Sequence, residues 1–259
     1  MFTPFDLTGK VALVTGGNGG IGLGMAAALA DAGADLAIWG TNAAKNEAAK
    51  ARLLKSGRRA EIFKVDVSDA AAAEAGMADT VKRLGRVDAC FANAGVTGRA
   101  KSLFDIDGAE WRRVLAVNLD GAFFTLRAAA GHMVARAEKG DPGGRLVGMA
   151  SLAARSGAAR NEHYAATKGG LVSMLKAMAV DFARYGVTAN AILPGWIETE
   201  MTAPNFAHDK FRANVMPRIP MRRWGKPADF GGIAVYLASD ASAYHTGDEI
   251  MIDGGYWVF

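Results

Sequence analysis

The sequence is poor in cysteine and histidine and has no long apolar run, and each scarcity excludes a class of protein. The single cysteine, Cys90, excludes an intrachain disulfide and a thiolate metal cluster. The four histidines, at 132, 163, 208 and 245, show no metal-ligand spacing. No apolar run approaches the length of a membrane-spanning helix, and the N-terminal "MFTPFDLTGKVALV" lacks the features of a secretion signal. We therefore expect a cytoplasmic protein with no metal site and no membrane partner.

The charge pattern gives no reason to expect a nucleic-acid partner. The net charge is +4, but the lysines and arginines are scattered along the chain. The densest pairs, Arg58–Arg59 and Arg222–Arg223, are too short to form a stripe that follows phosphates, and we interpret them as solvated surface. Hydrophobic residues make up 51% of the chain and charged residues 22%, which is typical of a globular protein with an ample core.

Short apolar segments alternate with alanine-rich segments along the chain. The apolar runs, from "KVALVTG" to "DEIMIDGG", are unbroken, which is typical of strands buried on both faces of a parallel sheet. This order predicts an α/β fold, in which a doubly wound, Rossmann-type parallel sheet of about seven strands carries helices on both faces. The segments long enough for helices are about 20–32, 43–56, 69–84, 109–138, 162–185 and 226–239.

No linker, repeat or low-complexity tract divides the chain, so we expect a single catalytic domain over residues 1–259. The most irregular stretch, 194–225, holds four of the seven prolines. It follows a predicted strand end, and doubly wound proteins bind ligands beyond the carboxyl ends of their strands. This position predicts a substrate lid around 195–225.

A glycine-rich loop, "TGGNGGIG", joins the first predicted strand to the first predicted helix. Gly16, Gly20 and Gly22 would let the backbone turn tightly and approach a pyrophosphate, and the helix N-terminus would supply amide donors. A glycine spacing alone is a weak signal, but the strand–loop–helix context is the one that the motif requires. No Gly-Lys-Ser/Thr follows, which excludes a Walker-type loop. The loop predicts nucleotide binding.

The spacing T-G-x-x-x-G-I-G resembles that of the short-chain dehydrogenase/reductase family, and further motifs follow in the family's order. "ANAG" resembles the family's N-N-A-G, with Ala92 in place of the first asparagine. "VNLDGAF" supplies Asn118, while Ser151 and the Y-x-x-x-K pair Tyr164 and Lys168 match the catalytic set. "ANAILPGWIETEM" and "TGDEIMIDGG" match the later cofactor loop and the closing strand. The resemblance covers almost the whole chain and implies hydride transfer between NAD(P)(H) and a ketone or secondary alcohol.

The tyrosine, lysine and serine of this set can form a proton-transfer device. Positions four apart share one helix face, so Tyr164 and Lys168 can point at one site. A free tyrosine titrates near pH 10, and we expect the ammonium group, with the positive nicotinamide ring, to lower the pKa of Tyr164 so that it exchanges a proton with the substrate. Ser151 would donate a hydrogen bond to the substrate oxygen. We interpret His163 as a surface or pocket-rim residue, because nothing pairs it with a nucleophile.

The resemblance adds further roles. It implies that Lys168 holds the nicotinamide ribose, that Asn118 helps to position a water linking Lys168 to solvent, and that Asp66–Val67 ends the third strand beside the adenine. The expected cofactor-binding residues are Gly16, Asn18, Gly19, Gly20, Ile21, Gly22, Gly40, Thr41, Asn42, Asp66, Val67, Asn93, Ala94, Gly95, Tyr164, Lys168, Pro194, Gly195, Ile197 and Thr199.

The choice between the two nicotinamide cofactors should depend on "WGTNAAK", after the second strand. An acidic residue there would bind the ribose hydroxyls of NAD and repel the extra phosphate of NADP. Gly40 occupies that place, but basic residues are missing at Thr41 and Gly19 as well. Thr41, Asn42 and Lys45 could hold a phosphate, or Thr41 and Asn42 could only cap the next helix. The pattern slightly favours NADP(H) and leaves NAD(H) open.

The candidate substrate residues belong to the lid and the strand ends. Their aromatic, mainly apolar character favours a hydrophobic ketone or secondary alcohol, although Arg155 and Arg160 leave an anionic group open, and half of these side chains could instead pack in the core or between subunits. The candidates are Val96, Leu152, Ala153, Arg155, Trp196 and Phe206, with Tyr256, Trp257 and Phe259 near the C-terminus.

Two other functions are compatible with this fold. A cofactor-binding regulator or scaffold would keep the glycine loop and lose the catalytic set, whereas this chain keeps all four positions. A non-redox lyase or epimerase could keep the cofactor and the tyrosine, and the sequence leaves it open. The segments 109–138 and 162–185 resemble the helices that the family buries between subunits, which implies a homotetramer.

Overall fold

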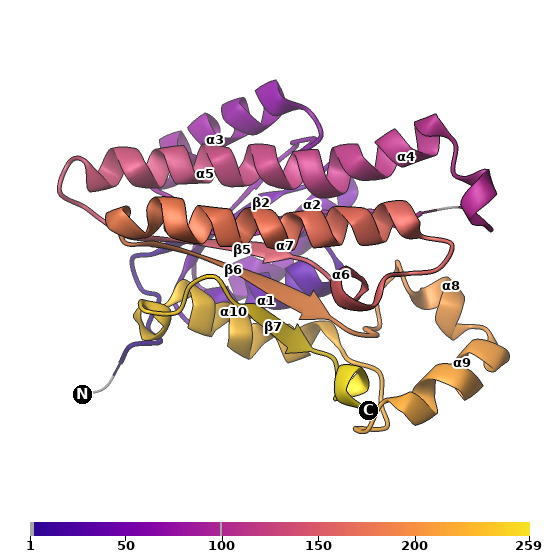
Figure 1. Cartoon of the computed structure of the whole chain (residues 1–259). Coiled ribbons are helices and arrows are strands. Elements are labelled where there is room, and N and C mark those ends of the chain that lie inside the picture. Colours follow the sequence, from indigo (N-terminus) through magenta and orange to yellow (C-terminus); the bar gives the residue numbers. More distant parts are fainter. Residues whose placement is uncertain (1–2, 99) are drawn as a thin grey trace.

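The computed structural model of the chain describes residues 3–98 and 100–259. Seven parallel strands form one sheet in the order β3-β2-β1-β4-β5-β6-β7 (Figure 1). The chain starts in the middle of the sheet and adds strands first toward β3 and then, from β4 on, toward β7. The doubly wound parallel sheet predicted from the sequence is confirmed. The strands are β1 Val11–Thr15, β2 Asp35–Trp39, β3 Ala60–Phe63, β4 Ala89–Ala92, β5 Gly144–Met149, β6 Val187–Pro194 and β7 Glu249–Ile252.

Helices cover both faces of the sheet. In Figure 1, α5 and α7 run side by side over one face, while α1 and α10 lie below the other. The helices begin near the positions expected from the alanine-rich segments, and several are capped as their sequences suggest: Asp69, for example, accepts hydrogen bonds from the first-turn amides of α3. The main helices are α1 Gly20–Asp31, α2 Ala43–Leu53, α3 Ala70–Leu84, α4 Gly108–Leu115, α5 Gly121–Ala137, α6 Ala153–Ser156, α7 Glu162–Phe182 and α10 Gly231–Ala238.

The long helix predicted over 109–138 is interrupted. A π-helical turn, Ala116–Asp120, separates α4 from α5, and it contains the buried Asn118. The side chain of Asn118 bonds to the backbone of Val96, just after β4, on both its amide and its carbonyl. A π turn adds one residue to a helical turn and often marks a functional site. The interruption places Asn118 against the loop that follows β4.

Alternate side chains of each strand enter different halves of the core. In β1, Val11 and Leu13 pack toward α3, α5 and α7, whereas Ala12 and Val14 pack toward α1 and α10. Both halves bury apolar side chains, so every residue of β1 is buried, which explains why the strand sequences are unbroken apolar runs. The sheet is therefore a rigid platform that presents loops at its carboxyl edge.

The stretch predicted as a lid folds into two short helices, α8 Ala203–Phe206 and α9 Asp209–Val215, which stand beyond the carboxyl end of β6 (Figure 1). The aromatic rings of this stretch pack on one another. Phe206 stacks on Trp224 with ring centroids 4.2 Å apart, and Trp196 meets Phe211 edge-on at 4.9 Å. The stretch thus has a small apolar cluster of its own.

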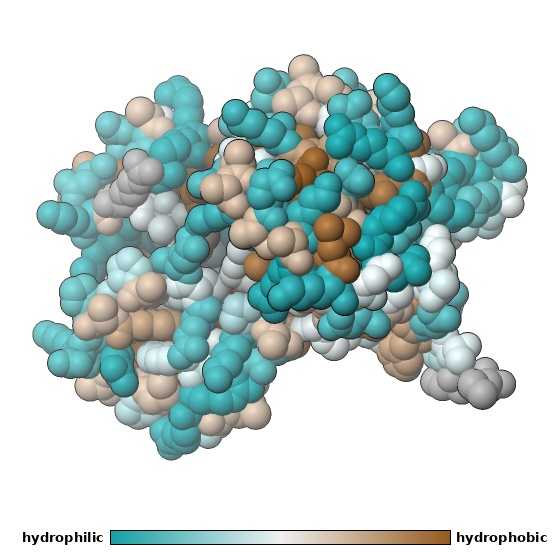
Figure 2. Space-filling view, turned by 180° about the vertical axis from the view of Figure 1, so that it is seen from behind, coloured by the Kyte–Doolittle hydropathy of each residue, from teal (hydrophilic) through white to brown (hydrophobic). Residues whose placement is uncertain are grey.

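The surface is largely polar. Figure 2 shows hydrophilic side chains over much of the face seen from behind, with smaller apolar groups between them. Arg58 and Arg59, interpreted from the sequence as solvated surface, both contact the Asp35 carboxylate, at 3.0 and 2.8 Å. Within residues 3–98 and 100–259, no helix combines the length and the apolar character needed to cross a membrane.

Candidate active site

A hollow of about 340 Å³ opens at the carboxyl ends of β1, β4, β5 and β6, where the strand order reverses. This is the position at which doubly wound sheets bind ligands. It brings together residues from distant parts of the sequence. Of the residues predicted from the sequence, the hollow is lined by Gly16, Asn18, Gly19, Gly20, Ile21, Asn93, Ala94, Gly95, Ser151, Tyr164, Lys168, Pro194, Gly195, Ile197 and Thr199.

The glycine loop forms a cradle that leaves no room for a side chain at Gly17 or Gly22. Gly16 and Gly20 have φ values of +61° and +50°, a left-handed conformation that favours glycine. A Cβ on Gly22 would lie 2.5 Å from both the Gly16 oxygen and the Asn93 Nδ2. The loop leads directly into the N-terminus of α1, where unpaired amides and the helix dipole favour a phosphate. These residues fit the pyrophosphate of a dinucleotide.

Sequence reasoning missed the role of Thr15, although it is the first residue of the recognised motif. Its buried hydroxyl accepts hydrogen bonds from the backbone amides of Asn93 and Ala94, at 3.0 and 2.9 Å. The Asn93 side chain returns a bond to the Thr15 carbonyl at 2.9 Å. These contacts tie the end of β1 to the loop after β4 and fix one wall of the hollow.

The catalytic candidates meet at the other end of the hollow. Ser151 and Tyr164 share a side-chain hydrogen bond. The buried Lys168, one helical turn after Tyr164, donates to the Met149 carbonyl at 2.7 Å and lies 5.5 Å from the centre of the tyrosine ring. The arrangement joins a phenol, a hydroxyl and an ammonium group on one wall, a set that can exchange a proton with a bound carbonyl or alcohol.

The pKa of Tyr164 differs from the expectation. In the protein alone, burial raises the pKa of the phenol above 10, and the hydrogen bond from Ser151 lowers it only in part. Burial also lowers the pKa of Lys168 to about 8. The Lys168 ammonium, which donates to the Met149 carbonyl, does not offset this effect of burial on the pKa of the phenol. At neutral pH, Tyr164 is therefore a protonated donor, and Lys168 is charged.

Asn118 does not line the hollow. Its Oδ1 accepts from the Val96 amide at 2.8 Å, and its Nδ2 donates to the Val96 carbonyl at 2.9 Å and to the Thr167 hydroxyl at 3.4 Å. These bonds commit its side chain to the loop after β4. It nevertheless lies close to the site: a Cβ on Gly95 would be 3.3 Å from Asn118 Oδ1 and 3.6 Å from Lys168 Nζ.

The residues expected to select the cofactor lie beside the glycine loop. Gly40 has no space for a side chain, because a Cβ there would be 2.3 Å from Asn18 Nδ2 and 2.5 Å from Asn46 Oδ1. Asn42 caps α2 by accepting from the Lys45 amide at 3.0 Å, which is the alternative that the sequence left open. The Lys45 ammonium lines the hollow and forms an ion pair with the lid carboxylate of Glu200.

Several other predicted cofactor residues do not line the hollow. The Asp66 carboxylate accepts bonds from the amide and hydroxyl of Ser68, at 3.0 and 2.7 Å, while Val67 packs in the core. Gly22 contributes instead by letting α1 pack closely against Gly16 and Asn93. Thr41 is exposed. The sequence also missed residues that do line the hollow, notably Met149, Ala150, Glu200, Met201 and Thr202.

None of the predicted substrate residues lines the hollow. Trp196 and Phe206 belong to the aromatic cluster of the 194–225 stretch, in which Trp196 meets Phe211 and Phe206 stacks on Trp224. Arg155 bonds to the Glu249 carboxylate at 2.5 Å. Leu152 is buried in the core, and the backbone of Val96 is bound by Asn118, while Ala153 begins α6. Near the C-terminus, Tyr256 packs against the Trp196 ring, whereas Trp257 and Phe259 are exposed.

His163 is neither a surface nor a rim residue, so that interpretation was wrong. Its side chain is fully buried, with Nε2 3.4 Å from Glu110 Oε1. The adjacent Tyr164 faces the hollow, and successive residues of a helix point in different directions, so His163 enters the protein interior beside it. A partner carboxylate 53 positions away in sequence could not be recognised without the fold.

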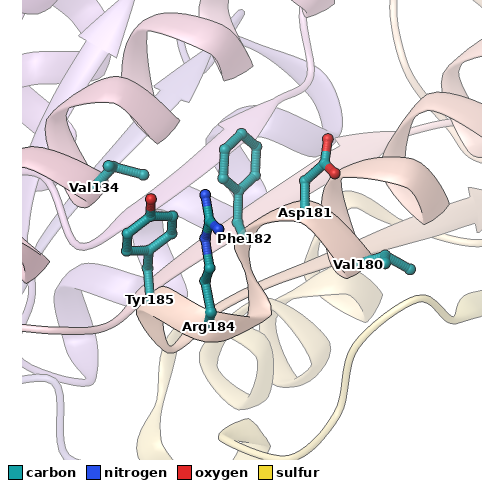
Figure 3. A pocket seen from close by; sticks show the side chains of 6 residues that line it. All are labelled: Val134, Val180, Asp181, Phe182, Arg184 and Tyr185. Atoms are coloured by element: carbon teal, nitrogen blue, oxygen red, sulfur yellow. The ribbon is translucent and has the colours of Figure 1, made fainter.

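A second hollow, of about 460 Å³, lies at the C-terminal end of α7 (Figure 3). It is formed by Val134 of α5 with Val180, Asp181, Phe182, Arg184 and Tyr185. It has no glycine loop and no buried acid–base pair. Within the described part of the chain, no group of three or more histidine, cysteine, aspartate or glutamate side chains could hold a metal ion.

Comparisons with known proteins agree with this geometry. The family model described as enoyl-(acyl carrier protein) reductase matches residues 16–257. L-rhamnose 1-dehydrogenase (NAD(P)(+)) from Sphingomonas sp. (strain SKA58) is 36% identical over 97% of this chain and 98% of its own. A short-chain type dehydrogenase/reductase from Mycobacterium marinum has a TM-score of 0.91 at 33% identity, over 98% of this chain and 97% of its own.

A further solved structure carries ligands. The gluconate 5-dehydrogenase from Burkholderia cenocepacia J2315, in complex with NADP and tartrate, has a TM-score of 0.93 at 34% identity, over 99% of this chain and 98% of its own. Family model, sequence relatives and structural neighbours all extend over nearly the whole chain. The chain therefore belongs to the short-chain dehydrogenase/reductase family and is an NAD(P)-dependent oxidoreductase that acts on an alcohol or ketone.

Proposed function

We propose that Tyr164 is the proton donor and acceptor of this oxidoreductase, with Ser151 and Lys168 as its partners. The observation that carries the proposal is the hydrogen bond between Ser151 and Tyr164 in the hollow that the glycine loop also lines. Burial raises the pKa of Tyr164 in the protein alone, so the phenol holds its proton at neutral pH. The positive nicotinamide ring of the oxidised cofactor would lower that pKa toward the working range for proton exchange with the substrate oxygen. Ser151 donates a hydrogen bond to the same oxygen as negative charge develops there.

The bound cofactor supplies or accepts the hydride. Gly16, Gly20 and Gly22 leave room for its pyrophosphate, and the α1 N-terminus donates amides to it. The Lys168 ammonium, charged below about pH 8, holds the ribose hydroxyls while it keeps its bond to Met149. Asn118 fixes the loop beside Lys168 through Val96. A water held near Asn118 connects Lys168 to solvent.

NADP(H) is the preferred cofactor in this proposal. Lys45 places a positive charge at the hollow, and Gly40 lacks the acidic side chain that would repel a phosphate. Asn42 Oδ1 is occupied as a helix cap, so Lys45, on exchanging its ion pair with Glu200 for the phosphate, carries most of the attraction. The NADP bound to the Burkholderia cenocepacia relative supports the same choice.

The substrate in this proposal is a hydroxylated carbohydrate or sugar acid. The hydrophobic substrate expected from the sequence depended on aromatic side chains that the lid buries in its own cluster. Two of the relatives described above are named for L-rhamnose and gluconate. The exposed Arg160, for which no ion pair is found within the described residues, is available for a substrate carboxylate.

The proposal extends to the domain organisation, the oligomeric state and the compartment of the protein. The chain works as one catalytic domain, with 195–225 as a lid over the hollow. It assembles as a homotetramer through α4, α5 and α7, whose exposed Trp111, Phe123 and Val180 support such a contact. It acts in the cytoplasm, where a lone buried cysteine is stable; burial raises the pKa of Cys90 to about 12. Light scattering of the purified protein tests the tetramer, and cell fractionation tests the compartment.

The experiment that tests the function measures reduced-nicotinamide absorbance with gluconate, L-rhamnose and a hydrophobic cyclic ketone. NADP(H) and NAD(H) are compared in parallel, with Ser151→Ala beside the wild type. We expect turnover with a hydroxylated substrate and about a hundredfold lower kcat in the variant. Turnover of the hydrophobic ketone alone would refute the substrate class, and a variant as active as wild type would refute the role of Ser151.

A further inference from the structure

The segment Val96–Gly98 is held by side chains of two helices. Asn161, the residue before α7, accepts a hydrogen bond from the Gly98 amide at 3.1 Å and donates one to the Thr97 hydroxyl at 3.1 Å. Arg113 of α4 donates to the Thr97 carbonyl at 2.8 Å. Three bonds thus fix two consecutive residues, Thr97 and Gly98, which belong to neither a helix nor a strand.

His163 stands behind the same segment. A Cβ on Gly98 would lie 2.2 Å from His163 Cε1 and 2.3 Å from Asn161 Oδ1, so the backbone of Gly98 is pressed against both side chains. His163 is fully buried and lies 3.4 Å from the Glu110 carboxylate, which Arg113 holds by two bonds of 2.8 Å. The chain Arg113–Glu110–His163 makes the support rigid.

This support is continuous with the catalytic site at both ends. Asn161 lies three residues before Tyr164 on the way into α7, and Gly95, just before the segment, lines the hollow beside Lys168. Asn118 holds Val96 between them. The start of α7 and the loop after β4 are therefore joined beside the hollow, which Gly95 and Tyr164 line.

We propose that Asn161, backed by His163, is a positioning residue that fixes Val96–Gly98 as the substrate-side wall of the site. The proposal rests on the function proposed above, because it concerns how that substrate approaches Tyr164. The fixed wall holds the substrate oxygen between Ser151 and Tyr164. The cofactor binds along the glycine loop and residues 93–95, whereas the Asn161 side chain bonds to Thr97 and Gly98. Releasing the wall therefore weakens substrate binding selectively.

The first test measures hydrogen–deuterium exchange of full-length protein, without any substrate. In Asn161→Ala the Gly98 amide loses its acceptor, so the peptide that contains Val96–Gly98 exchanges at least about tenfold faster while the strands keep their protection. Ser102→Ala is the matched control, because it removes a hydrogen bond to Asp105 in the same connection but none to α7. An unchanged exchange rate of the Val96–Gly98 peptide in Asn161→Ala would show that Asn161 does not fix this segment, whatever the substrate is.

The second test separates substrate binding from cofactor binding. Asn161→Ala should raise the substrate KM about tenfold, with the NADPH Kd, measured by nicotinamide fluorescence, within twofold of wild type. Asn161→Asp keeps the acceptor for Gly98 and should recover part of the loss. Thr97→Val removes the hydroxyl that accepts the second hydrogen bond of Asn161. Because Thr97 is exposed, the change leaves the core intact, and it should also raise the substrate KM. A KM unchanged in both alanine and valine variants, or a Kd raised as much as KM, would overturn the proposal.

Discussion

The hydroxyl of Thr15 accepts hydrogen bonds from the backbone amides of Asn93 and Ala94, at 3.0 and 2.9 Å. Thr15 ends β1, and Asn93 follows β4, so the contact spans the point where the strand order reverses. It gives an acceptor to the amides of two half-buried residues that line the hollow. The width of the cofactor hollow at this end therefore depends on one threonine.

Thr15→Val should lower the free energy of unfolding by about 2–4 kcal/mol, because it leaves these amides without an acceptor while it keeps the side-chain shape. Urea unfolding followed by circular dichroism measures the difference. Thr15→Ser keeps the hydroxyl and serves as the control, with an expected loss of about 1 kcal/mol or less. Equal losses in the valine and serine variants would contradict the role of the hydrogen bonds.

Gly22→Ala should weaken cofactor binding, because its Cβ would lie 2.5 Å from the Gly16 oxygen and from Asn93 Nδ2. We expect the NADPH Kd to rise at least about tenfold, or 1.4 kcal/mol. Gly131→Ala is the matched control within α5, where a Cβ meets nothing within 4 Å. Fluorescence titration measures the NADPH Kd of both variants. An unaltered Kd in Gly22→Ala would show that close packing at Gly22 is not required for cofactor binding.

Lys168→Met should change how stability depends on pH. The pKa of Lys168 is 10.5 in the unfolded chain and about 8 in the folded protein, because burial disfavours the charge. Between these values the unfolded chain holds a proton that the folded protein lacks, so wild type gains stability relative to Lys168→Met as the pH rises from 8 to 10.5. Thermal unfolding of both proteins across this range measures the gain. If stability depended on pH in the same way in both proteins, the Lys168 ammonium would not be desolvated in the folded protein.

Lys45→Met should raise the NADPH Kd about tenfold and leave the NADH Kd within twofold, because one charged hydrogen bond to a phosphate is lost. Lys50→Met, in the same helix, is the control, since Lys50 lies near Glu61 and not in the hollow. An equal rise in the Kd of NADPH and NADH would show that Lys45 does not bind the extra phosphate of NADPH.

The doubly wound parallel sheet, and the meeting of Ser151, Tyr164 and Lys168 in one hollow, could be predicted from local patterns. Unbroken apolar runs, the glycine spacing and the pair Tyr164 and Lys168 are each encoded within a few neighbouring residues. The pKa of Tyr164 could not be predicted in this way, because it depends on how deeply the phenol is buried and on where Met149 holds the lysine.

Contacts between distant segments account for the other differences. The partner of His163 lies in another helix. Trp196 packs against Phe211, and Phe206 packs against Trp224, rather than in the hollow. Aromatic residues near a strand end look the same in sequence whether they line a pocket or fill a cluster. Only the folded arrangement separates the two.

The most direct test of the role of Tyr164 compares wild type with Tyr164→Phe. Turnover of the hydroxylated substrate is followed by reduced-nicotinamide absorbance, and NADPH binding is measured for both proteins. The account predicts a kcat about 10²- to 10⁴-fold lower in Tyr164→Phe, with the NADPH Kd unchanged, because only the proton donor is removed. A variant that binds NADPH and turns over at a rate within tenfold of wild type would contradict it.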